Sequence, residues 1–580
     1  MIMRKLTAVV SACFICVAAT ATTTVDVGKL VADKDADMTP VVLGILDNAA
    51  DRDVVISFPK GTYHFYPDKA VGKYHAVTNH DNGYKRFAFP LIGCNDVTVE
   101  GNGSEFIFHG VIVPVLVENS KNITLRNFSI DWEVPFYVQA TVLASDPANS
   151  SMDVEFTPFS KVAMDGERLT FDNNGYLQPG LGQNMVFDPK TRAVAYRAND
   201  YMLNKPTKAI PLGGMKYRIE GKFVKSPAPA GMIYVFKGMQ GENRLAPAIH
   251  LSNSAGILAE NLDIHTSAGM AVIGEKTSDI TLRRVNVALR EGTDRIVSAS
   301  ADATHFCNCR GKLLIENCLF ENMLDDGINV HGTYMRIDRI TGPRTMTARL
   351  IHPQQQDYDF ATKGDSIQFV DEGTILPKGF GVMASVRKIN EGYMMFTFAS
   401  DLPAGLKQGD GLENISWYPE LTFRNNVVRN NRARGILVSS RNKVVIEGNT
   451  LSSMMSSILF EGDLDFWHES GAVRDVLIRN NTFLDNVYGG GKGGSVIWIN
   501  PHVRQRVDGR PYENNIRITG NTFRTFDPSI LNALSTGGLV FSGNTIEPSG
   551  TYPPLSPGMP AVKLEGCPGA VIEGNIYKGF

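Results

Sequence analysis

A short unit recurs along this chain and restricts its fold more than any other sequence feature. The unit is an aliphatic or β-branched residue, any residue, an apolar residue, two further residues and then Asn. It ends at Asn102, Asn426, Asn449, Asn481, Asn521, Asn544 and Asn575. Alternating apolar residues predict short strands, and Asn and Gly after each strand suit the left-handed backbone of a turn. Units too short to bury a core alone must stack, so the repeat predicts an all-β chain built on a parallel β-helix.

The spacing of the copies separates this fold from another all-β architecture. Several neighbouring copies lie 23 to 31 residues apart, as at Asn426 and Asn449 or at Asn544 and Asn575. Weaker copies include one in which Cys318 stands in place of the Asn. The alternative is a β-sandwich with coincidental Asn-Gly turns, but its hairpins would recur about every 8–12 residues. The longer spacing favours the β-helix.

Two stretches contain strand-like runs but no copy of the unit, namely residues 134–250 and 333–418. Asparagine is sparse in the second stretch, where it occurs at Asn390 and Asn414 alone. We expect each stretch to be a β-barrel-like domain inserted between coils. Residues 38–50 are predicted to form a helix that covers the open end of the β-helix. The other predicted segments are 22–133 with the cap and first coils, 251–332 with the candidate site, and 419–580 with the last coils.

The first 21 residues are typical of an export signal. Arg4 and Lys5 precede an apolar stretch from Leu6 to Ala19, and the small residues Ala19 and Ala21 suit a cleavage site. The stretch is shorter than the roughly 20 residues that a membrane span needs, and no later segment qualifies. We therefore expect an exported protein without a membrane span, located in the periplasm or secreted.

Charge and cysteine content exclude several classes of function. The 57 Lys and Arg against 60 Asp and Glu give a net charge of −3, and no long basic run occurs, so no nucleic-acid partner is expected. Beyond the signal the cysteines are odd in number and sparse, which predicts no disulfide framework. Cys307 and Cys309 lack a second Cys or His pair at zinc-ligand spacing, so no metal is expected there.

Two acidic segments match each other at the spacing of one coil. Asp302 and Asp326 begin similar five-residue stretches that are offset by 24 residues. Arg434 begins a third such stretch in the next part of the β-helix. Stacked coils place equivalent residues above one another about 4.8 Å apart. The register therefore predicts a column of Asp302, Asp326 and Arg434, with Asp325 beside it.

Such a column suits the hydrolysis of a glycosidic bond. One carboxylic acid must stay protonated to donate to the leaving oxygen, while a second must be ionised to activate water or to attack the sugar. Clustered carboxylates raise one another's pKa, and a nearby Arg holds one of them ionised. The alternative is that these aspartates only cap turns, which is a common role of Asp. The residues alone leave the two interpretations about equally supported.

The central segments closely resemble glycoside hydrolase family 110, the bacterial exo-α-1,3-galactosidases. The resemblance is strongest in Asp302-Ala303-Thr304-His305-Phe306 and in the run from Asp325-Asp326-Gly327 to His331-Gly332-Thr333-Tyr334. It extends to Asn79-His80-Asp81, Asn127-Phe128-Ser129-Ile130-Asp131, Asn430-Asn431-Arg432-Ala433-Arg434-Gly435 and Gly471-Ala472-Val473-Arg474-Asp475. One departure is the segment before Trp467, which leaves the preferences for the sugars beyond the cleaved bond open.

This resemblance implies a right-handed parallel β-helix with inserted β-barrel domains, and hydrolysis with inversion that needs no metal or other cofactor. It also implies a galactose-terminated oligosaccharide or glycoconjugate as substrate, either the branched blood group B determinant or linear Galα1,3Gal, and it suggests a homodimer. The catalytic aspartates of the family fall on Asp302, Asp325 and Asp326. We expect Asp302 to be the general acid and Asp325, Asp326 or both to act as the base, although the direction of proton transfer cannot be read from sequence.

Six further side chains are candidates for substrate binding: His80, His305, His331, Arg432, Arg434 and Trp467. Trp467 offers a flat surface for the apolar face of galactose, although it could equally pack an inserted loop. The two arginines could bind hydroxyls or hold the aspartates ionised, against the alternative of plain salt bridges. A lone histidine is more often structural than functional.

Two other classes of function remain as alternatives. A β-helical polysaccharide lyase would need a basic proton abstractor and often Ca²⁺, whereas this cluster is rich in carboxylates. A non-catalytic glycan-binding β-helix would need no coincident acids. Release of galactose from an α-galactoside separates hydrolysis from both.

Overall fold

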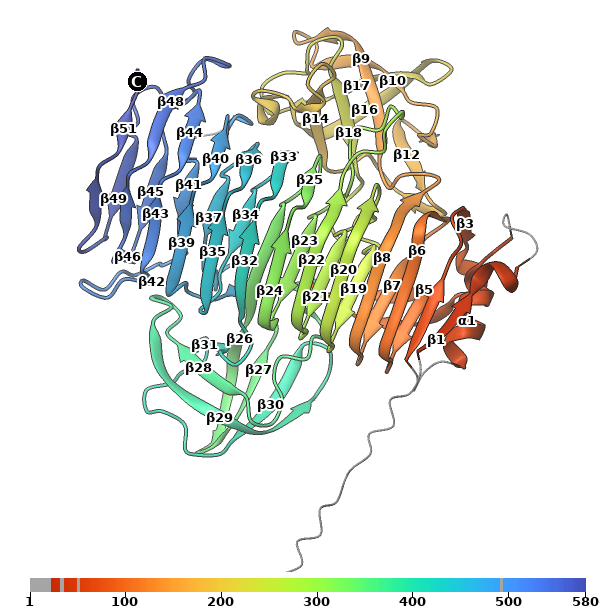
Figure 1. Cartoon of the computed structure of the whole chain (residues 1–580). Coiled ribbons are helices and arrows are strands. Elements are labelled where there is room, and N and C mark those ends of the chain that lie inside the picture. Colours follow the sequence, from red (N-terminus) through yellow and green to blue (C-terminus); the bar gives the residue numbers. More distant parts are fainter. Residues whose placement is uncertain (1–21, 32–35, 49–52, 491–493, 580) are drawn as a thin grey trace, which may run out of the picture.

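The structure is a computed structural model that describes residues 22–31, 36–48, 53–490 and 494–579. The predicted export signal lies outside these residues. The main body is a β-helix whose coils run from the N-terminal helix α1 (Thr39–Asp47) to the last strands β49 to β51 (Figure 1). Among the described residues, no helix has the length and apolar character to cross a bilayer. The predicted fold class, a parallel β-helix with two β-rich inserts, is confirmed.

Each coil contributes to three parallel sheets. The first sheet contains β2 (Val54–Ser57), β6 (Asn95–Phe108), β8 (Lys121–Trp132), β20 (Ala255–Ile264), β22 (Ser278–Val287), β24 (Arg310–Glu316), β32 (Pro419–Arg424), β35 (Lys443–Glu447), β39 (Asp475–Arg479), β43 (Ile516–Thr519), β47 (Val540–Ser542) and β50 (Val571–Glu573). The second contains β3 (Thr62–Phe65), the far halves of β6, β8, β20 and β22, and β25 (Leu319–Glu321), β33 (Val427–Asn431), β36 (Thr450–Ser453), β40 (Thr482–Leu484), β44 (Thr522–Thr525), β48 (Thr545–Pro548) and β51 (Ile576–Tyr577). The third contains β5 (Gly83–Ile92), β7 (Val113–Glu118), β19 (Ile249–Ser252), β21 (Val272–Glu275), β23 (Thr304–Cys307), β26 (Ile328–Gly342), β34 (Ile436–Val438), β37 (Ile458–Phe460), β41 (Ile497–Ile499), β45 (Leu531–Leu534) and β49 (Val562–Glu565).

The repeated asparagines form a buried ladder at the turn between the first and second sheets. Each Oδ1 accepts the backbone N–H of the ladder residue one coil earlier, at 2.8–3.0 Å from Cys318 to Asn575. Each Nδ2 donates to a strand carbonyl of that earlier coil. Cys318 occupies the Asn position, as the sequence predicts. A buried polar side chain is stable only when its hydrogen bonds are made, and the ladder makes them.

The prediction that Asn and Gly supply the left-handed residues of these turns is confirmed, although the repeated Asn itself is not that residue in the ladder coils. In the ladder coils the left-handed residue is the one before the repeated Asn, as at Asn425 with φ 55° and Gly448 with φ 67°. The repeated Asn points inward and bonds between coils instead. Asn102 differs, since it is itself left-handed with φ 49° and is exposed.

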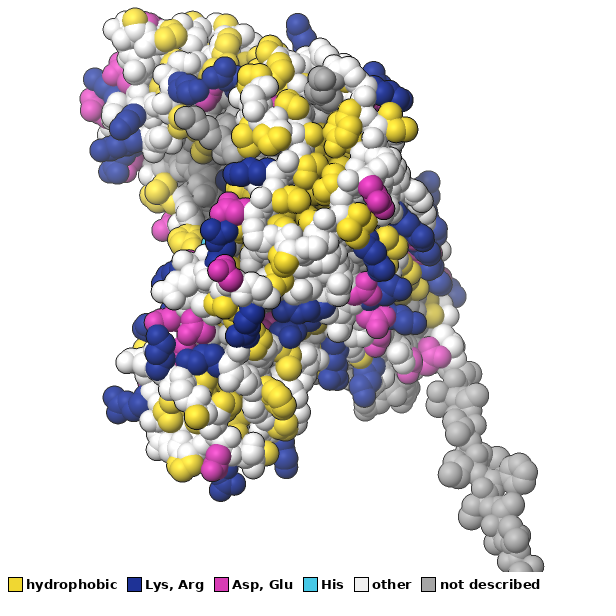
Figure 2. Space-filling view, turned by 90° about the vertical axis from the view of Figure 1, so that its left-hand side faces the viewer, with side chains coloured by type: hydrophobic (Ala, Val, Ile, Leu, Met, Phe, Trp, Pro, Cys, Tyr) yellow, Lys and Arg dark blue, Asp and Glu magenta, His cyan; other side chains and the backbone are white. Residues whose placement is uncertain are grey.

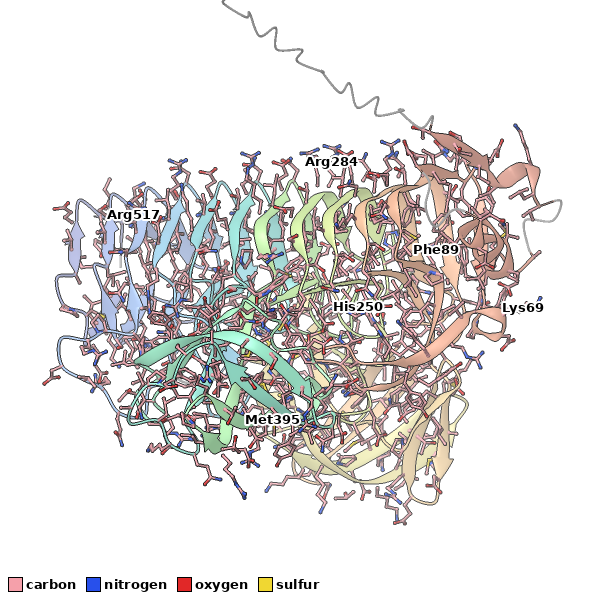
Figure 3. All side chains as sticks on the ribbon, turned by 90° about the horizontal axis from the view of Figure 1, so that it is seen from below. Lys69, Phe89, His250, Arg284, Met395 and Arg517 are labelled. Carbon is pink, nitrogen blue, oxygen red and sulfur yellow. The ribbon has the colours of Figure 1, made fainter. Side chains whose placement is uncertain are left out.

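A ladder of alternating charge follows the outer face of the first sheet. Glutamate and arginine alternate at one position over eight successive coils: Glu100, Arg126, Glu260, Arg283, Glu316, Arg424, Glu447 and Arg479. Arg284 and Arg517 project outward from the same side of the β-helix (Figure 3). Exposed ion pairs contribute little individually, but alternation avoids the repulsion that stacking like charges would cause.

The two inserts differ in how they close. The first is an antiparallel sheet in the order β15 (Ala193–Val194), β14 (Asn184–Asp188), β18 (Ile233–Phe236), β9 (Val138–Asp146), β10 (Ser151–Phe156), β17 (Lys216–Phe223) and β16 (Leu203–Gly213), with a small sheet of β11 (Val162–Asp165), β12 (Arg168–Asn173) and β13 (Tyr176–Gln178). In the second, β26 pairs with β27 (Thr345–Arg349), then β30 (Tyr393–Phe398), β29 (Pro377–Lys388), β28 (Ser366–Val370) and β31 (Gly411–Asn414), which returns to β26 and closes a barrel. Both inserts project to one side of the β-helix and leave a recess between them (Figure 2).

Candidate active site

The three residues predicted from coil register lie one above another where the second sheet passes into the third. Asp302 precedes β23, Asp326 precedes β26 and Arg434 precedes β34. These strands pair in register, so the residues two positions before them stack. The N–H of Ala303 donates to the carbonyl of Asp326 at 2.9 Å, and the N–H of Gly327 donates to that of Arg434 at 3.0 Å. The column therefore rests on the backbone pairing of three coils.

Asp325 is held beside this column by cations. Nη2 of Arg244 lies 2.8 Å from its Oδ2, and Nη1 of Arg432 lies 3.3 Å from its Oδ1. Burial alone raises the pKa of Asp325, but the charges of Arg432, Arg244 and Lys237 outweigh burial and hold it below its usual range. Asp325 is therefore ionised at neutral pH, with both oxygens engaged and little basicity.

Asp302 and Asp326 have the opposite electrostatic character. Burial and the charge of Asp325 raise the pKa of Asp302 to about 7. Burial, together with Asp302 and Asp325, also raises the pKa of Asp326, against the attraction of Arg434. Arg434 reaches both oxygens of Asp326, through its backbone N–H at 2.7 Å and its Nη2 at 2.9 Å. One site thus combines a carboxyl that is readily protonated with one that stays ionised.

A chain of histidines indicates which carboxyl carries the proton. His331 Nδ1 donates to the carbonyl of Gly332 at 2.7 Å, so the Nε2 of a neutral His331 accepts. His305 Nε2 lies 2.8 Å from it and donates, which leaves His305 Nδ1 as an acceptor 2.8 Å from Oδ2 of Asp302. Burial lowers the pKa of His305 to about 4 and also lowers that of His331. With both rings neutral, the chain is complete when Asp302 is protonated.

The column opens into a cavity of about 270 Å³. The lining side chains come from the segment before β5, the end of the first insert, the β-helix corner and the loop 461–469: Asn79, Arg244, Met270, Asp302, His305, Asp325, Asp326, Asn329, Arg432, Arg434, Leu437, Glu461, Asp463, Trp467 and Glu469. Parts of the chain that are far apart in sequence therefore enclose a single pocket.

Glu469 adds a carboxylate to the wall beyond the aspartate trio and the loop residues Glu461 and Asp463. Asn79 Nδ2 donates to its Oε1 and Asn329 Nδ2 donates to its Oε2, each at 3.2 Å. Burial raises the pKa of Glu469, but His331, His305 and Asn329 outweigh burial and lower it. Glu469 is thus an ionised hydrogen-bond acceptor that faces the pocket.

The loop 461–469 places Trp467 in the wall. Asp463 accepts the backbone N–H groups of Asp465, Phe466 and Trp467, which fixes a tight turn before the indole. His502 braces the loop through Glu461 at 2.7 Å and Asp463 at 3.4 Å. Hydrogen bonds to these two carboxylates raise the pKa of His502 to about 10. The half-buried indole is therefore held at the pocket by a charged brace.

Two predicted substrate-binding histidines do not reach the pocket. The His80 ring is fully buried, with Nδ1 bonded to the carbonyl of Thr78 at 3.1 Å and Nε2 accepting the N–H of Met270 at 3.2 Å. His331 is likewise buried and bonds to His305 and to the backbone. Both act within the protein interior, because their ring nitrogens are already used. His305, Arg432, Arg434 and Trp467 line the pocket.

Eight residues that line the pocket were not among the predicted site residues: Asn79, Arg244, Met270, Asn329, Leu437, Glu461, Asp463 and Glu469. Arg244 lies at the end of the first insert, where no repeat sets a register. Glu469 follows Trp467 closely and Asn329 lies in the central motif, so proximity to those predicted residues was the one signal available.

The acidic column has little capacity for a divalent cation. Oxygens of Asp302, Asp325 and Asp326 lie within 4.8 Å of one another, which is a spacing that a cation could bridge. However, Arg244 and Arg432 engage Asp325, and Arg434 engages Asp326. A cation would have to displace these guanidinium groups, so the charges are already balanced by the protein.

Comparisons with known proteins agree with this architecture. Residues 138–233 match the family model described as GLAA-B beta-barrel domain I, and residues 345–412 match GLAA-B beta-barrel domain II. These two matches fall on the two inserts.

Relatives extend over most of the chain. It is 33% identical to Alpha-1,3-galactosidase A of Shewanella woodyi over 90% of this chain and 85% of the relative. It is 33% identical to Alpha-1,3-galactosidase B of Bacteroides thetaiotaomicron over the same shares. It is 34% identical to Alpha-1,3-galactosidase B of Akkermansia muciniphila over 85% of this chain, and spans 62% of that longer relative.

Proposed function

Because the chain belongs to glycoside hydrolase family 110, the family of α-1,3-galactosidases, we propose that it removes terminal α-1,3-linked galactose from glycans. The observation that carries this proposal is the buried column in which Asp302 has a raised pKa beside the ionised Asp325. Hydrolysis of a glycosidic bond needs a protonated carboxyl as acid and a second, ionised carboxyl as base. The charge of Asp325 favours the protonated form of Asp302, and Asp326 stands next to Asp302 in the column as the candidate base. A pocket of about 270 Å³, enclosed by an insert, a loop and the β-helix corner, suits the end of a sugar chain, and hence exo action.

In the proposed mechanism Asp302 is the general acid. Its proton is stabilised by the His305–His331 chain in the resting enzyme and passes to the leaving oxygen as the bond breaks. Asp326 is the better base of the adjacent pair, because its pKa is raised whereas that of Asp325 is lowered. Asp325 supplies a fixed negative charge that favours the protonated form of Asp302 and the positive charge that develops on the sugar ring.

Stereochemistry is the most sensitive test of this mechanism. Inverting enzymes typically hold their two carboxyls about 6.5–9.5 Å apart, with water between them, and retaining enzymes hold them about 5–5.5 Å apart. The nearest oxygens of the aspartate trio lie within 4.8 Å of one another. Inversion therefore requires water to bind on the side of Asp326 that faces away from Asp302. Initial release of β-galactose, followed by NMR, supports inversion, and initial release of α-galactose excludes it.

Substrate class is tested by incubation with p-nitrophenyl α-galactoside, Galα1,3Gal and the blood group B trisaccharide. Galactose release from either natural glycan is expected, and comparison of the two rates determines whether a branched or a linear acceptor is preferred. A product that absorbs in the ultraviolet through a new double bond would instead indicate a lyase. Binding without release of galactose would indicate a glycan-binding protein.

A further inference from the structure

Asp302 lies in a long connection that belongs to no strand. This connection runs from residue 288, after β22, to residue 303, before β23. The corresponding connections that carry Asp326 and Arg434 run only over residues 322–327 and 432–435. A longer connection has more backbone freedom to lose, and a general acid must be held in one place to act. Contacts besides the pairing of the coils must therefore fix the residues ahead of Asp302.

The first insert lies against this connection and bonds to its backbone (Figure 1). On β9, the amide of Gln139 accepts the N–H of Ile296 at 3.2 Å and donates to the carbonyl of Asp294 at 2.9 Å. The hydroxyl of Tyr137 donates to the carbonyl of Val297 at 3.1 Å. Gln139 and Tyr137 are each only 3% exposed. The insert thus holds the connection through buried side chains.

Lys237 makes the bond of this group that is nearest to Asp302. It follows β18 directly, and its Nζ donates to the carbonyl of Ser300 at 2.8 Å, two residues before Asp302. Its own backbone is anchored, since its N–H donates to the carbonyl of Gln183 at 3.0 Å. The side chain is 6% exposed. An ammonium group is costly to bury, so this bond and nearby negative charges must offset the cost.

The charge of Lys237 also acts on the aspartates. The charged groups that interact with its ammonium are Asp325, Arg244, Arg432 and Asp302. Burial, with Arg244 and Arg432, lowers the pKa of Lys237 to about 7, against the attraction of the two aspartates. A positive charge favours the ionised form of a carboxyl. Lys237 therefore opposes the effect of burial and of Asp325, which raise the pKa of Asp302.

We propose that Lys237 is a positioning residue, through which the first insert fixes the segment that carries Asp302 and adjusts the charge around its carboxyl. The inference rests on the proposed function, since it takes Asp302 as the general acid. Lys237 does not line the catalytic pocket, so it acts through Asp302 and not on the sugar.

Lys237→Met keeps most of the length of the side chain and removes its charge and its hydrogen bond. Because the acid is then held less firmly, kcat should fall about tenfold to a hundredfold with little change in KM. Because a positive charge near Asp302 is lost, the decline of kcat/KM at alkaline pH should move to higher pH, by up to about one unit.

Lys276→Met is the matched control. Lys276 is equally buried, at 6% exposed, but it lies 3.7 Å from Asp365 and does not line the catalytic pocket. This variant should lose stability, while the alkaline decline of kcat/KM should stay in place.

A titration that needs no turnover separates this inference from the proposed hydrolysis. ¹³C NMR of the full chain, labelled at its aspartate carboxyls, follows Asp302 through the signal that is lost in Asp302→Asn. The pKa of that carboxyl should be higher in Lys237→Met than in the wild type. If the wild type releases no galactose, the proposed function fails, and the titration still tests Lys237.

Two results overturn the proposal. One is a Lys237→Met enzyme with the kcat and the alkaline decline of the wild type. The other is a lower kcat with the alkaline decline and the Asp302 titration both unmoved, as in Lys276→Met, which would show that Lys237 only supports packing. Lys237→Gln, which is neutral but polar, is measured in the same way if Lys237→Met does not fold, and the same shift is expected.

Discussion

The asparagine ladder and the aspartate column both arise from stacking one residue per coil, but stacking stabilises the asparagines and destabilises the ionised aspartates. Both stack one residue per coil at a corner of the β-helix, on the same backbone pairing. In the ladder each amide has a donor and an acceptor, so stacking like upon like satisfies every member. In the column the stacked groups are carboxyls, which repel one another unless some are protonated or paired with arginine. The same register therefore gives satisfied hydrogen bonds between the first and second sheets, and repulsion between carboxyls where the second sheet passes into the third.

Buried polar atoms without a hydrogen-bond partner also distinguish the aspartate column from the asparagine ladder. Oδ1 of Asn329, Oδ1 of Asn431 and Nε of Arg434 are buried without a hydrogen-bond partner among the residues that the structure describes. All three are in the column or next to it, whereas the ladder amides from Asn426 to Asn544 are absent from that set. Buried atoms without a partner therefore occur at the candidate site and not in the ladder, and such local exceptions are expected at functional sites.

Asp302→Asn is expected to have the largest effect. The amide cannot donate an acidic proton, so kcat/KM should fall about a thousandfold, in the range typical of a lost general acid. Because the raised pKa of Asp302 makes its ionised form costly in the folded state, the variant should be at least as stable as the wild type above pH 7. Kinetics and thermal unfolding of the same preparation measure both.

Asp263→Asn is the matched control, since Asp263 is an exposed strand residue on β20. It should keep full activity. Near wild-type rates in Asp302→Asn, or loss of its folded structure, would contradict the role assigned to Asp302.

Asn481→Ala tests whether the asparagine ladder stabilises the fold. The substitution removes the acceptor for Asn449 and the donor to the carbonyl of Ile446, both buried. The free energy of unfolding should fall by about 2–4 kcal/mol, since the partners are left unsatisfied. Activity of the remaining folded protein should not change. Asn149→Ala, in an exposed turn, should cost less than about 0.5 kcal/mol, and an equal cost for both would show that the ladder adds no stability.

The pH dependence of kcat/KM should have an alkaline limb set by Asp302. The protonated form of Asp302 is the active one, so kcat/KM should fall roughly tenfold per pH unit above about pH 7. On the acid side kcat/KM should fall as well, where Asp326, the proposed base with a raised pKa, becomes protonated. Asp325 stays ionised throughout, because its pKa lies below the usual range. Asn481→Ala should show the same limb as the wild type. A profile without any decline above neutral pH would refute the assignment.

Trp467→Ala should have the smallest effect. The indole contributes surface to the pocket but no acidic group, so KM should rise about fivefold with little change in kcat. Phe380→Ala is the control, because Phe380 is 71% exposed and does not line the pocket. A fall in kcat without change in KM would show that the loop positions the aspartates instead of the sugar.

Repetition explains how much of this molecule could be predicted from its sequence. The period of the Asn unit determines the β-helix, the place of Cys318 in the ladder, and the stacking of Asp302 on Asp326 across 24 residues. Where the repeat stops, prediction fails: Arg244 and Glu469 reach the pocket from an insert and a loop whose paths no period specifies.

Single-residue propensities do not fix the position of two kinds of side chain. Asn is a frequent left-handed turn residue, but here a Gly or Asn one position earlier takes that conformation and frees the repeated Asn to bond between coils. His80 looked available for sugar binding, yet packing against Met270 and Thr78 uses both of its nitrogens. Both placements depend on long-range contacts that a local pattern does not contain.

The continuity of strand β26 restricts how the second insert can move relative to the β-helix. Its first residues pair with β23 and β34 in the β-helix, and its later ones close the barrel with β27 and β31. Where the chain enters the barrel, one continuous strand therefore joins scaffold and barrel, and residues 415–418 form a short return connection to β32 (Pro419–Arg424). Rotation of the barrel as a separate body would break backbone pairing in both, so the barrel should tumble with the β-helix as one unit. Substrate entry then depends on small excursions of side chains and of the loop 461–469, on a faster timescale than domain closure.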